Sequence, residues 1–321
     1  MRSGAWLTCC RPQNLDDLIG QDNLKQKARI AIGAALQRGE PLPHCLLTSS
    51  GGGLGKTTFA TVLSNEMYSP LISTTGQCLV SATDLRNILI RLKHNSMLLV
   101  DEFHGIGRGA AEEFLLVLEE GVLNVNLGSR GAPLRIPVPP FTLIAATTQP
   151  SAISAPLTQR MGLHFHFDFY SVNDLKRIVQ GIEAAWGIEF DEAVREAIAR
   201  RSLGVPRIAL RHAERVRDVA QARGLTTATL PEFEFAMRLD GIDHVGLRPD
   251  HRHVLRLLAN ADPRPVSARS LALALGVEIP TVSQVIEPPL VRLGLMIIGS
   301  GGRRITEVGL QHLEQAKREA K

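Results

Sequence analysis

The sequence has no long hydrophobic run. No apolar stretch among its 321 residues approaches the roughly 20 residues that a membrane-spanning helix needs. Its first ten residues, MRSGAWLTCC, lack the longer apolar core and the cleavage site of a signal peptide. Because 44% of the residues are hydrophobic, the chain is rich enough in apolar side chains to form the cores of two or three domains. We therefore expect a globular protein of the cytoplasm.

Cysteine is also scarce and unpatterned. The four cysteines, Cys9, Cys10, Cys45 and Cys78, form no C-x-x-C pair and have no histidine at metal-binding spacing. This spacing argues against a zinc site and against a disulfide framework, so free thiols are expected.

Net charge is absent from most of the chain. Residues 245–321 contain 11 Lys and Arg against 7 Asp and Glu, which accounts for the whole formal charge of +4. The other residues carry 25 of each sign, the remainder of 36 basic and 32 acidic residues. A basic final segment on a neutral body suggests contact with a polyanion, although an ordinary solvated surface would have a similar composition.

A glycine-rich stretch at residues 46–58, LLTSSGGGLGKTT, predicts a phosphate-binding loop. Its glycines allow positive φ angles, so that successive N–H groups can point into one concavity. Lys56 would reach the β- and γ-phosphates, Thr57 would bind Mg²⁺, and the residues that follow would begin a helix. The pattern G-x-x-x-x-G-K-[ST] departs from its consensus only at Ser50.

A second element of the site is expected in MLLVDEFH. Four apolar residues without alternation indicate a strand buried on both faces, and this strand ends in Asp101 and Glu102. Two carboxylates there need a partner, and Mg²⁺ supplies one. Asp101 would bind the metal while Glu102 would activate the attacking water. The alternative is that the two carboxylates simply mark a solvent-exposed strand end. The phosphate loop earlier in the chain favours the Mg²⁺ interpretation.

Residues 122–138 predict a β-hairpin. Leu123, Val125 and Leu127 share one face of its first strand, and Leu134, Ile136 and Val138 share a face of the second. A hairpin inserted between elements of a parallel sheet has no pairing partner within that sheet. We therefore expect it to project with an apolar face toward a partner, the alternative being that it packs on its own domain.

Two further strands follow the hairpin. FTLIAATTQ is fully apolar and ends in Thr147 and Thr148, either of which could sense the γ-phosphate. In HFHFDFY, alternation places His164, His166 and Asp168 on one face. Without a third well-placed ligand we interpret these histidines as surface or site-rim residues rather than as metal ligands.

The remaining sequence predicts two small domains. Helical patterns run from residue 171 to about residue 239. Three helices, a Gly-tipped hairpin and a final helix then give a winged-helix pattern, which binds DNA in some proteins and proteins in others. The expected fold is thus α/β with a parallel sheet, a small all-α domain and a C-terminal winged helix.

The order of these elements resembles the AAA+ ATPases and, within them, the RuvB family of motors that drive branch migration at Holliday junctions. The resemblance runs from Arg11 to about Leu313. It rests on the following segments: RPQNLDDLIGQ, GGGLGKTT, STTGQ, LLVDEFH, PPFTLIAATT, APLTQRMG, DFY, GVPRIALR and VIEPPLVRLG. It implies a tail at 1–10, an ATPase domain at 11–170, a helical lid at 171–243 and a DNA-binding winged helix at 244–321.

The resemblance also implies roles for matching residues. ATP would be bound by Arg11, Gly53, Gly55, Lys56, Thr57, Thr58 and Tyr170, with Mg²⁺ on Thr57 and Asp101. The catalytic set would comprise Glu102, the first sensor Thr147 or Thr148, the arginine finger Arg160 acting on a neighbouring subunit, and the second sensor Arg207. Assembly into a ring, a hexamer in this family, would then be a condition of catalysis.

Partners follow from the same resemblance. The hairpin at 122–138, with its apolar Leu123, Val125, Leu127, Leu134 and Ile136, corresponds to the segment that docks the junction-binding protein RuvA. The winged helix would contact duplex or junction DNA through Arg303, with Arg304 beside it.

Several positions depart from the family pattern. Ser50 replaces a glycine, Gly51 and Gly52 stand where prolines are usual, and Thr158 stands where an arginine is common. Gly121 replaces a tyrosine, and Ile298 occupies a usually basic position on the wing. Two hypotheses therefore remain. The chain is an ATP-driven DNA motor or, alternatively, an AAA+ regulatory or loader protein that uses nucleotide as an assembly switch. The presence of both Glu102 and Arg160 favours turnover.

Overall fold

The computed structural model describes residues 11–125 and 134–319. The chain divides into two compact units, residues 1–168 and residues 169–321. Each unit is described by itself below.

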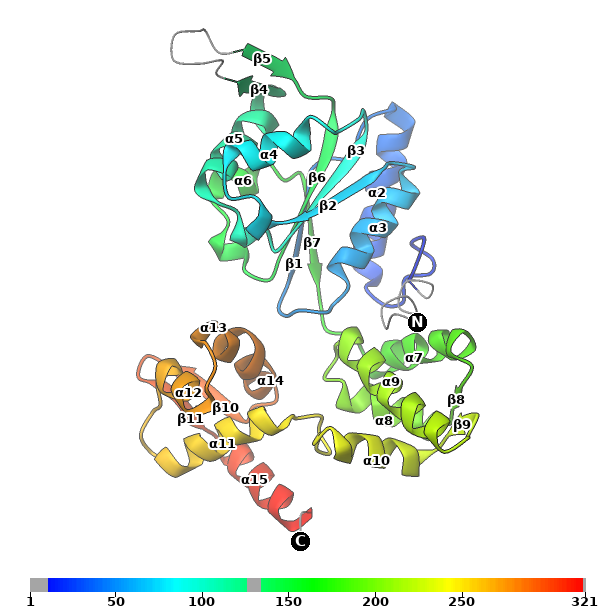
Figure 1. Cartoon of the computed structure of the whole chain (residues 1–321), viewed down its shortest axis with the longest axis vertical. Helices are drawn as coiled ribbons and strands as arrows, with labels where there is room; N and C mark the ends of the chain where they lie inside the picture. The colour runs from blue at the N-terminus through cyan, green and yellow to red at the C-terminus, as the bar shows by residue number, and fades with distance from the viewer. Residues whose placement is uncertain (1–10, 126–133, 320–321) are drawn as a thin grey trace. The chain divides into compact units, whose positions relative to one another are not determined.

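A five-stranded parallel sheet forms the centre of the first unit, with the strand order β2-β3-β6-β1-β7 (Figure 1). The strands are β1 (Cys45–Ser49), β2 (Leu71–Thr75), β3 (Ser96–Asp101), β6 (Phe141–Thr147) and β7 (Leu163–Phe167). The three inner strands are almost wholly buried, as their unbroken apolar sequences predict. In the edge strand β7 the expected alternation is confirmed, because His164 and His166 are exposed while Phe165 and Phe167 are buried.

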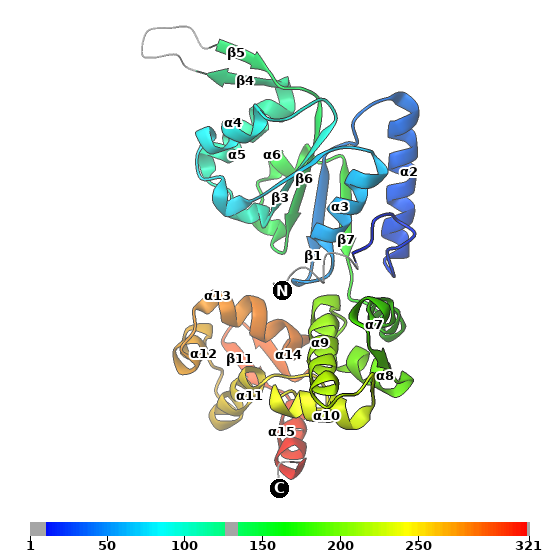
Figure 2. The same ribbon diagram turned by 45° about the vertical axis from the view of Figure 1, so that its right-hand side comes forward.

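Helices cover both faces of this sheet. Figure 2 shows α2 and α3 on one side and α4, α5 and α6 on the other. Their bounds are α2 (Asp22–Arg38), α3 (Lys56–Glu66), α4 (Ala82–Leu89), α5 (Arg108–Glu120) and α6 (Ala155–Gln159). The N-cap of helix α4 is Ser81, whose hydroxyl accepts a hydrogen bond from the Asp84 N–H. Short 3₁₀ turns, η1 (Gly76–Cys78), η2 (Phe103–Gly105) and η3 (Pro150–Ala152), connect several of the elements.

One histidine is built into the sheet in its neutral form. His44, just before β1, accepts the backbone N–H of Leu143 on its Nδ1, at 3.0 Å. Burial lowers the pKa of His44 to about 4. Because protonation of Nδ1 would remove the acceptor, the sheet depends on the uncharged ring.

The segment before α2 differs from its expected form. The helical spacing of Leu15, Leu18 and Ile19 within residues 11–21 favours a helix, but these residues form turns instead. Gly20 and Gln21 both have positive φ, at 71° and 54°, which breaks a right-handed helix. The segment is still anchored, since Leu15 is buried and its N–H donates to the Glu66 carboxylate at 2.8 Å.

The predicted hairpin lies outside the main sheet, as Figure 1 shows. Strands β4 (Val122–Val125) and β5 (Leu134–Pro137) pair antiparallel, with Leu123 opposite Ile136 and Val125 opposite Leu134. The prediction that the whole apolar face meets a partner is wrong at the base of the hairpin. There Leu123 is 2% exposed and Ile136 packs against the same core, because the base rests on helix α5. Leu134 is 47% exposed, whereas Leu127 lies outside the described residues.

The second unit begins with a helical lid. Its helices are α7 (Val172–Trp186), α8 (Glu192–Arg201), α9 (Pro206–Ala222) and α10 (Leu230–Leu239). Two-residue strands, β8 (Glu189–Phe190) and β9 (Thr227–Ala228), pair parallel and are the one departure from an all-helical lid among its described residues.

A winged helix completes this unit. It comprises α11 (Pro249–Ala261), α12 (Ala268–Leu275), α13 (Ile279–Thr281), α14 (Glu287–Arg292), the wing strands β10 (Met296–Gly299) and β11 (Gly302–Ile305), and α15 (Glu307–Glu319). A π-helical segment η4 (Val282–Ile286) joins α13 to α14, just before Pro288 and Pro289. Proline has no N–H for the helical ladder, so the wider turn fits this position.

None of the single helices in residues 11–125 and 134–319 is long and apolar enough to cross a membrane. The pair Ala268–Leu275 and Ile279–Arg292, bent by 102°, passes the same test of length and composition.

Candidate nucleotide and DNA sites

The phosphate loop connects β1 to α3, at the carboxyl edge of the sheet. Gly53 and Gly55 have φ angles of 81° and 102°, which only glycine adopts without strain. Lys56 is buried and its Nζ donates to Ser49 Oγ at 2.6 Å, while Ser49 Oγ donates to the Gly51 carbonyl at 2.7 Å. The loop therefore brings one ammonium group and the amino end of a helix to the same place, which suits a polyphosphate.

Thr57 and Asp101 meet as predicted. The Thr57 hydroxyl donates to Asp101 Oδ2 at 2.8 Å, from the first turn of α3 to the end of β3. Adjacent ligands of an octahedral Mg²⁺ ion, each at about 2.0–2.1 Å, lie about 2.9 Å apart. The two oxygens thus fit neighbouring positions around one Mg²⁺. Among the described residues no group of three His, Cys, Asp or Glu is placed to hold a metal ion by itself, so phosphate and water oxygens would have to complete such a site.

Glu102 leaves the strand in an unusual conformation. Its backbone is left-handed, with φ 48° and ψ 50°, and its N–H donates to Asp101 Oδ1 at 2.9 Å. Left-handed backbone is strained for a residue other than glycine and is found most often where function requires it. Its side chain is 45% exposed and lies 3.3 Å from His104 Nδ1. A half-exposed carboxylate at a strand end is placed to meet a water molecule.

The two threonines after β6 face different surroundings. Thr147 is fully buried and its hydroxyl accepts the Gln149 N–H at 2.9 Å. The Thr148 hydroxyl lies 3.5 Å from Glu102 Oε2, and Thr148 is partly exposed. Both threonines therefore lie close to Glu102 or its neighbours, but only Thr148 of the two is accessible to solvent. Thr58 follows Thr57 in the first turn of α3 and is partly buried.

Three residues near this cluster were missed from the sequence. His104 and Gln149 contact each other at 3.2 Å between their Nε2 atoms. Gly76 lies against the strand end, where a Cβ atom would come within 2.3 Å of the Glu102 carbonyl oxygen. The histidine of DEFH and the glycine of STTGQ were visible in the sequence, but the contacts between separate loops were not.

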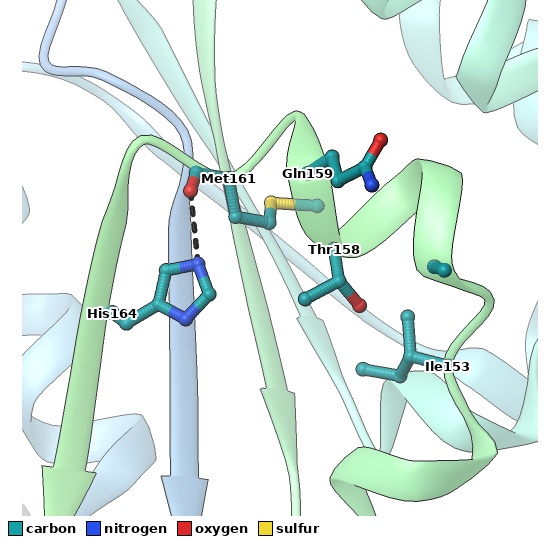
Figure 3. A pocket seen from close by; sticks show the side chains of 6 residues that line it. Ile153, Thr158, Gln159, Met161 and His164 are labelled. Carbon is teal, nitrogen blue, oxygen red and sulfur yellow. Dashed lines mark hydrogen bonds between the residues drawn. The ribbon is translucent and has the colours of Figure 1, made fainter.

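Arg160 caps the short helix α6 and is bound within its own unit. Its guanidinium forms an ion pair with Glu119 of α5, and both side chains are partly exposed, at 47% and 38%. A cavity of about 470 Å³ adjoins α6, lined by Ile153, Ala155, Thr158, Gln159, Met161 and His164 (Figure 3). The ion pair with Glu119 thus holds the Arg160 guanidinium on the surface of its own unit.

The other predicted nucleotide contacts belong to the start of the described chain and to the second unit. Arg11 is exposed at the start of the described chain. Tyr170 and Arg207 belong to the second unit, where Tyr170 is buried and Arg207 is exposed in the first turn of α9. The Tyr170 N–H donates to the Gly204 carbonyl at 2.9 Å, which joins the start of the lid to the turn before α9.

The wing holds one paired and one more accessible arginine. Arg303 donates from Nε and Nη2 to the two carboxylate oxygens of Glu287, at 2.8 and 3.1 Å. Glu287 is 2% exposed, so this pair is largely buried. Arg304 is 49% exposed and lies 3.9 Å from Asp262. The departure Ile298 is 51% exposed on the same hairpin.

The parallel sheet, the phosphate loop, the Asp101–Glu102 pair and the helical lid define an AAA+ P-loop ATPase. Family models described as the "Holliday junction DNA helicase RuvB P-loop domain", the "RuvB AAA lid domain" and the "RuvB C-terminal winged helix domain" match residues 10–167, 170–243 and 244–314. The chain belongs to the RuvB family.

Individual relatives agree with this assignment. The chain is 38% identical over 306 residues to a protein of Fervidobacterium nodosum, covering 94% of this chain and 88% of that one. It is 37% identical over 310 residues to a protein of Kosmotoga olearia, covering 96% and 90%. Both relatives are named Holliday junction branch migration complex subunit RuvB. The solved Thermotoga maritima RuvB Holliday junction branch migration motor is 35% identical, covers 95% of this chain and 98% of that one, and superposes with a TM-score of 0.87.

Proposed function

We propose that this protein is an ATP-driven DNA motor that moves the branch point of Holliday junctions in recombination and repair. One observation carries the proposal. Lys56, Thr57, Asp101 and Glu102 converge at the carboxyl edge of the parallel sheet, in a chain that matches the RuvB family through all three of its parts. Such a motor works on chromosomal DNA, so we place it in the bacterial cytoplasm.

Each residue of the cluster has a task in ATP hydrolysis. Lys56 would leave Ser49 to neutralise the β- and γ-phosphates. Thr57 and Asp101 would hold Mg²⁺, which supplies charge neutralisation on the phosphates when bound. Glu102 would orient the attacking water and accept its proton. Thr148, the more accessible of the two threonines, would contact the γ-phosphate, while Thr147 supports the loop from within.

The site is completed by another subunit in this proposal. Arg160 would leave Glu119 and reach the γ-phosphate bound by a neighbouring copy, where its charge stabilises the transition state. A finger supplied in trans requires a ring, and we propose the hexamer of the family. Within each subunit, Tyr170 and Arg207 of the lid would contact the nucleotide, and Arg11 would lie near the adenine.

DNA and protein partners would meet different parts of the chain. We assign phosphate contact to Arg304, with Arg303 supporting the wing through Glu287 rather than touching DNA. Such contacts are independent of sequence and weaken with salt. The distal hairpin, with the exposed Leu134, would dock a RuvA-like protein, and Leu134→Asp should weaken that docking while leaving the ATPase rate unchanged.

The test compares ATP hydrolysis by the wild type and Glu102→Gln, with and without duplex DNA. Loss of the proton acceptor should lower kcat by at least about 100-fold while nucleotide still binds. Glu112→Gln, an exposed carboxylate on α5, is the matched control. The alternative, a loader protein switched by nucleotide, would be supported if the wild type and Glu102→Gln hydrolysed ATP equally slowly while both formed oligomers. A synthetic junction with RuvA then tests branch migration directly.

A further inference from the structure

His104 occupies the centre of a small polar cluster beside Glu102. Its Nδ1 lies 3.0 Å from Thr147 Oγ1 and 3.3 Å from Glu102 Oε2. On the other side of the ring, Nε2 lies 3.2 Å from the Gln149 amide nitrogen. The side chain is 22% exposed, so water competes little for these contacts. One imidazole therefore joins the end of β3 to the end of β6.

The contacts favour one tautomer of the ring. The Gln149 amide nitrogen, which can only donate, faces His104 Nε2, so Nε2 accepts in this arrangement. The neutral ring then bears its hydrogen on Nδ1, which faces Thr147 Oγ1 and the Glu102 carboxylate. Gln149 is itself held in place, because its backbone N–H donates to Thr147 Oγ1 at 2.9 Å. The loop after β6 thereby directs a donor toward Glu102.

We propose that His104 is a positioning residue that holds the Glu102 carboxylate in its working orientation, and that Gln149 fixes the required tautomer. The inference rests on the proposed role of Glu102 in hydrolysis. Glu102 needs such a support because its side chain is 45% exposed and its other side-chain contact, with Thr148, is 3.5 Å long.

Three substitutions of His104 distinguish the effect of the hydrogen-bond donor at Nδ1 from the effect of the ring's volume. His104→Asn retains an amide nitrogen at the position of Nδ1, two bonds beyond Cβ. His104→Gln moves the amide one bond farther, to the position of Nε2, and His104→Ala removes both. We expect kcat to fall about tenfold in the Ala and Gln variants, as for the loss of one hydrogen bond to a charged group, and to stay within about threefold in the Asn variant.

Nucleotide affinity, measured with a fluorescent ADP analogue, should be unchanged in all three, and the exposed His94→Ala serves as the matched control. In the Glu102→Gln background, His104→Ala should cause no further loss, because the histidine acts through that carboxylate.

Equal impairment of the Asn and Ala variants would overturn the inference, and so would a full additional loss in the Glu102→Gln background. If His104→Ala fails to fold, the Asn and Gln variants still decide the question. An unimpaired Glu102→Gln enzyme would overturn the proposed function itself, whereas an inactive Glu102→Gln beside a fully active His104→Ala would overturn only this inference.

Discussion

Replacing Arg303 by methionine should destabilise the wing rather than simply remove a DNA contact. Methionine keeps the aliphatic volume of the side chain but leaves the Glu287 carboxylate, which is 2% exposed, without its bidentate partner. Removing one member of a buried ion pair costs about 3–5 kcal/mol. Because the Arg303 side chain is 18% exposed and water can reach part of the site, we take the lower figure of about 3 kcal/mol.

A loss of about 3 kcal/mol raises the equilibrium constant for local opening about 160-fold, at 1.36 kcal/mol per factor of ten. Tryptophan fluorescence would not detect this change, because Trp6 and Trp186 both lie outside residues 244–321. Hydrogen exchange by mass spectrometry on the full chain would detect it, in peptides that cover α14, β10 and β11. The effect should reach Val266, whose N–H and carbonyl both bond to the Arg303 backbone.

Two further variants make the outcome decisive. Glu287→Met combined with Arg303→Met removes both charges and should recover most of the protection. Arg304→Met should leave exchange unchanged but lower DNA affinity and its salt dependence. Unchanged exchange in Arg303→Met, together with lost DNA binding, would refute the reasoning and return Arg303 to the DNA surface.

Three other predictions follow from contacts in the first unit. Glu119→Gln should free Arg160 and so lower the protein concentration at which specific ATPase activity is half-maximal. The decrease should be at most about fivefold, because exposed ion pairs contribute up to about 1 kcal/mol. An unchanged concentration dependence would contradict this prediction. The pKa of His44 is lowered to about 4 in the folded protein, so on acidification the unfolded chain takes up a proton at this histidine before the folded chain does. The free energy of unfolding should therefore fall by about 3 kcal/mol as the pH drops from 6.5 to 4. His44→Asn keeps an acceptor for the Leu143 N–H without titrating, so its urea midpoint should depend less on pH than that of the wild type. Gly76→Ala should lower kcat by displacing the Glu102 carbonyl, with little effect on nucleotide affinity measured by titration.

Much of the fold could be predicted because local sequence patterns indicate its strands and helices. The unbroken apolar runs predicted β3 and β6, and alternation correctly placed His164 and His166 on the exposed face of β7. The phosphate loop was found from its glycine pattern and Lys56–Thr57, and the Asp101–Glu102 pair from the apolar strand that precedes it. The Thr57–Asp101 hydrogen bond bears out their proximity.

What could not be predicted depends on contacts between distant segments. Arg303 looked like a free basic residue until Glu287, 16 positions earlier, was seen to bind it. Leu123 follows the same alternation as the rest of the hairpin, yet burial against α5 removes it from any partner surface. The turns at residues 11–21 replace a helix because two consecutive residues adopt positive φ, which leucine spacing does not reveal. The roles of the site residues and the domain boundaries remain predictions.

The left-handed backbone of Glu102 has a consequence for how this protein can be improved. A glycine at that position would relieve the strain of about 1 kcal/mol and would remove the carboxylate at the same time. Under the proposed role of Glu102, a screen for thermal stability alone would enrich chains that fold better but turn over ATP slowly. Engineering of this ATPase should therefore select for turnover and stability together.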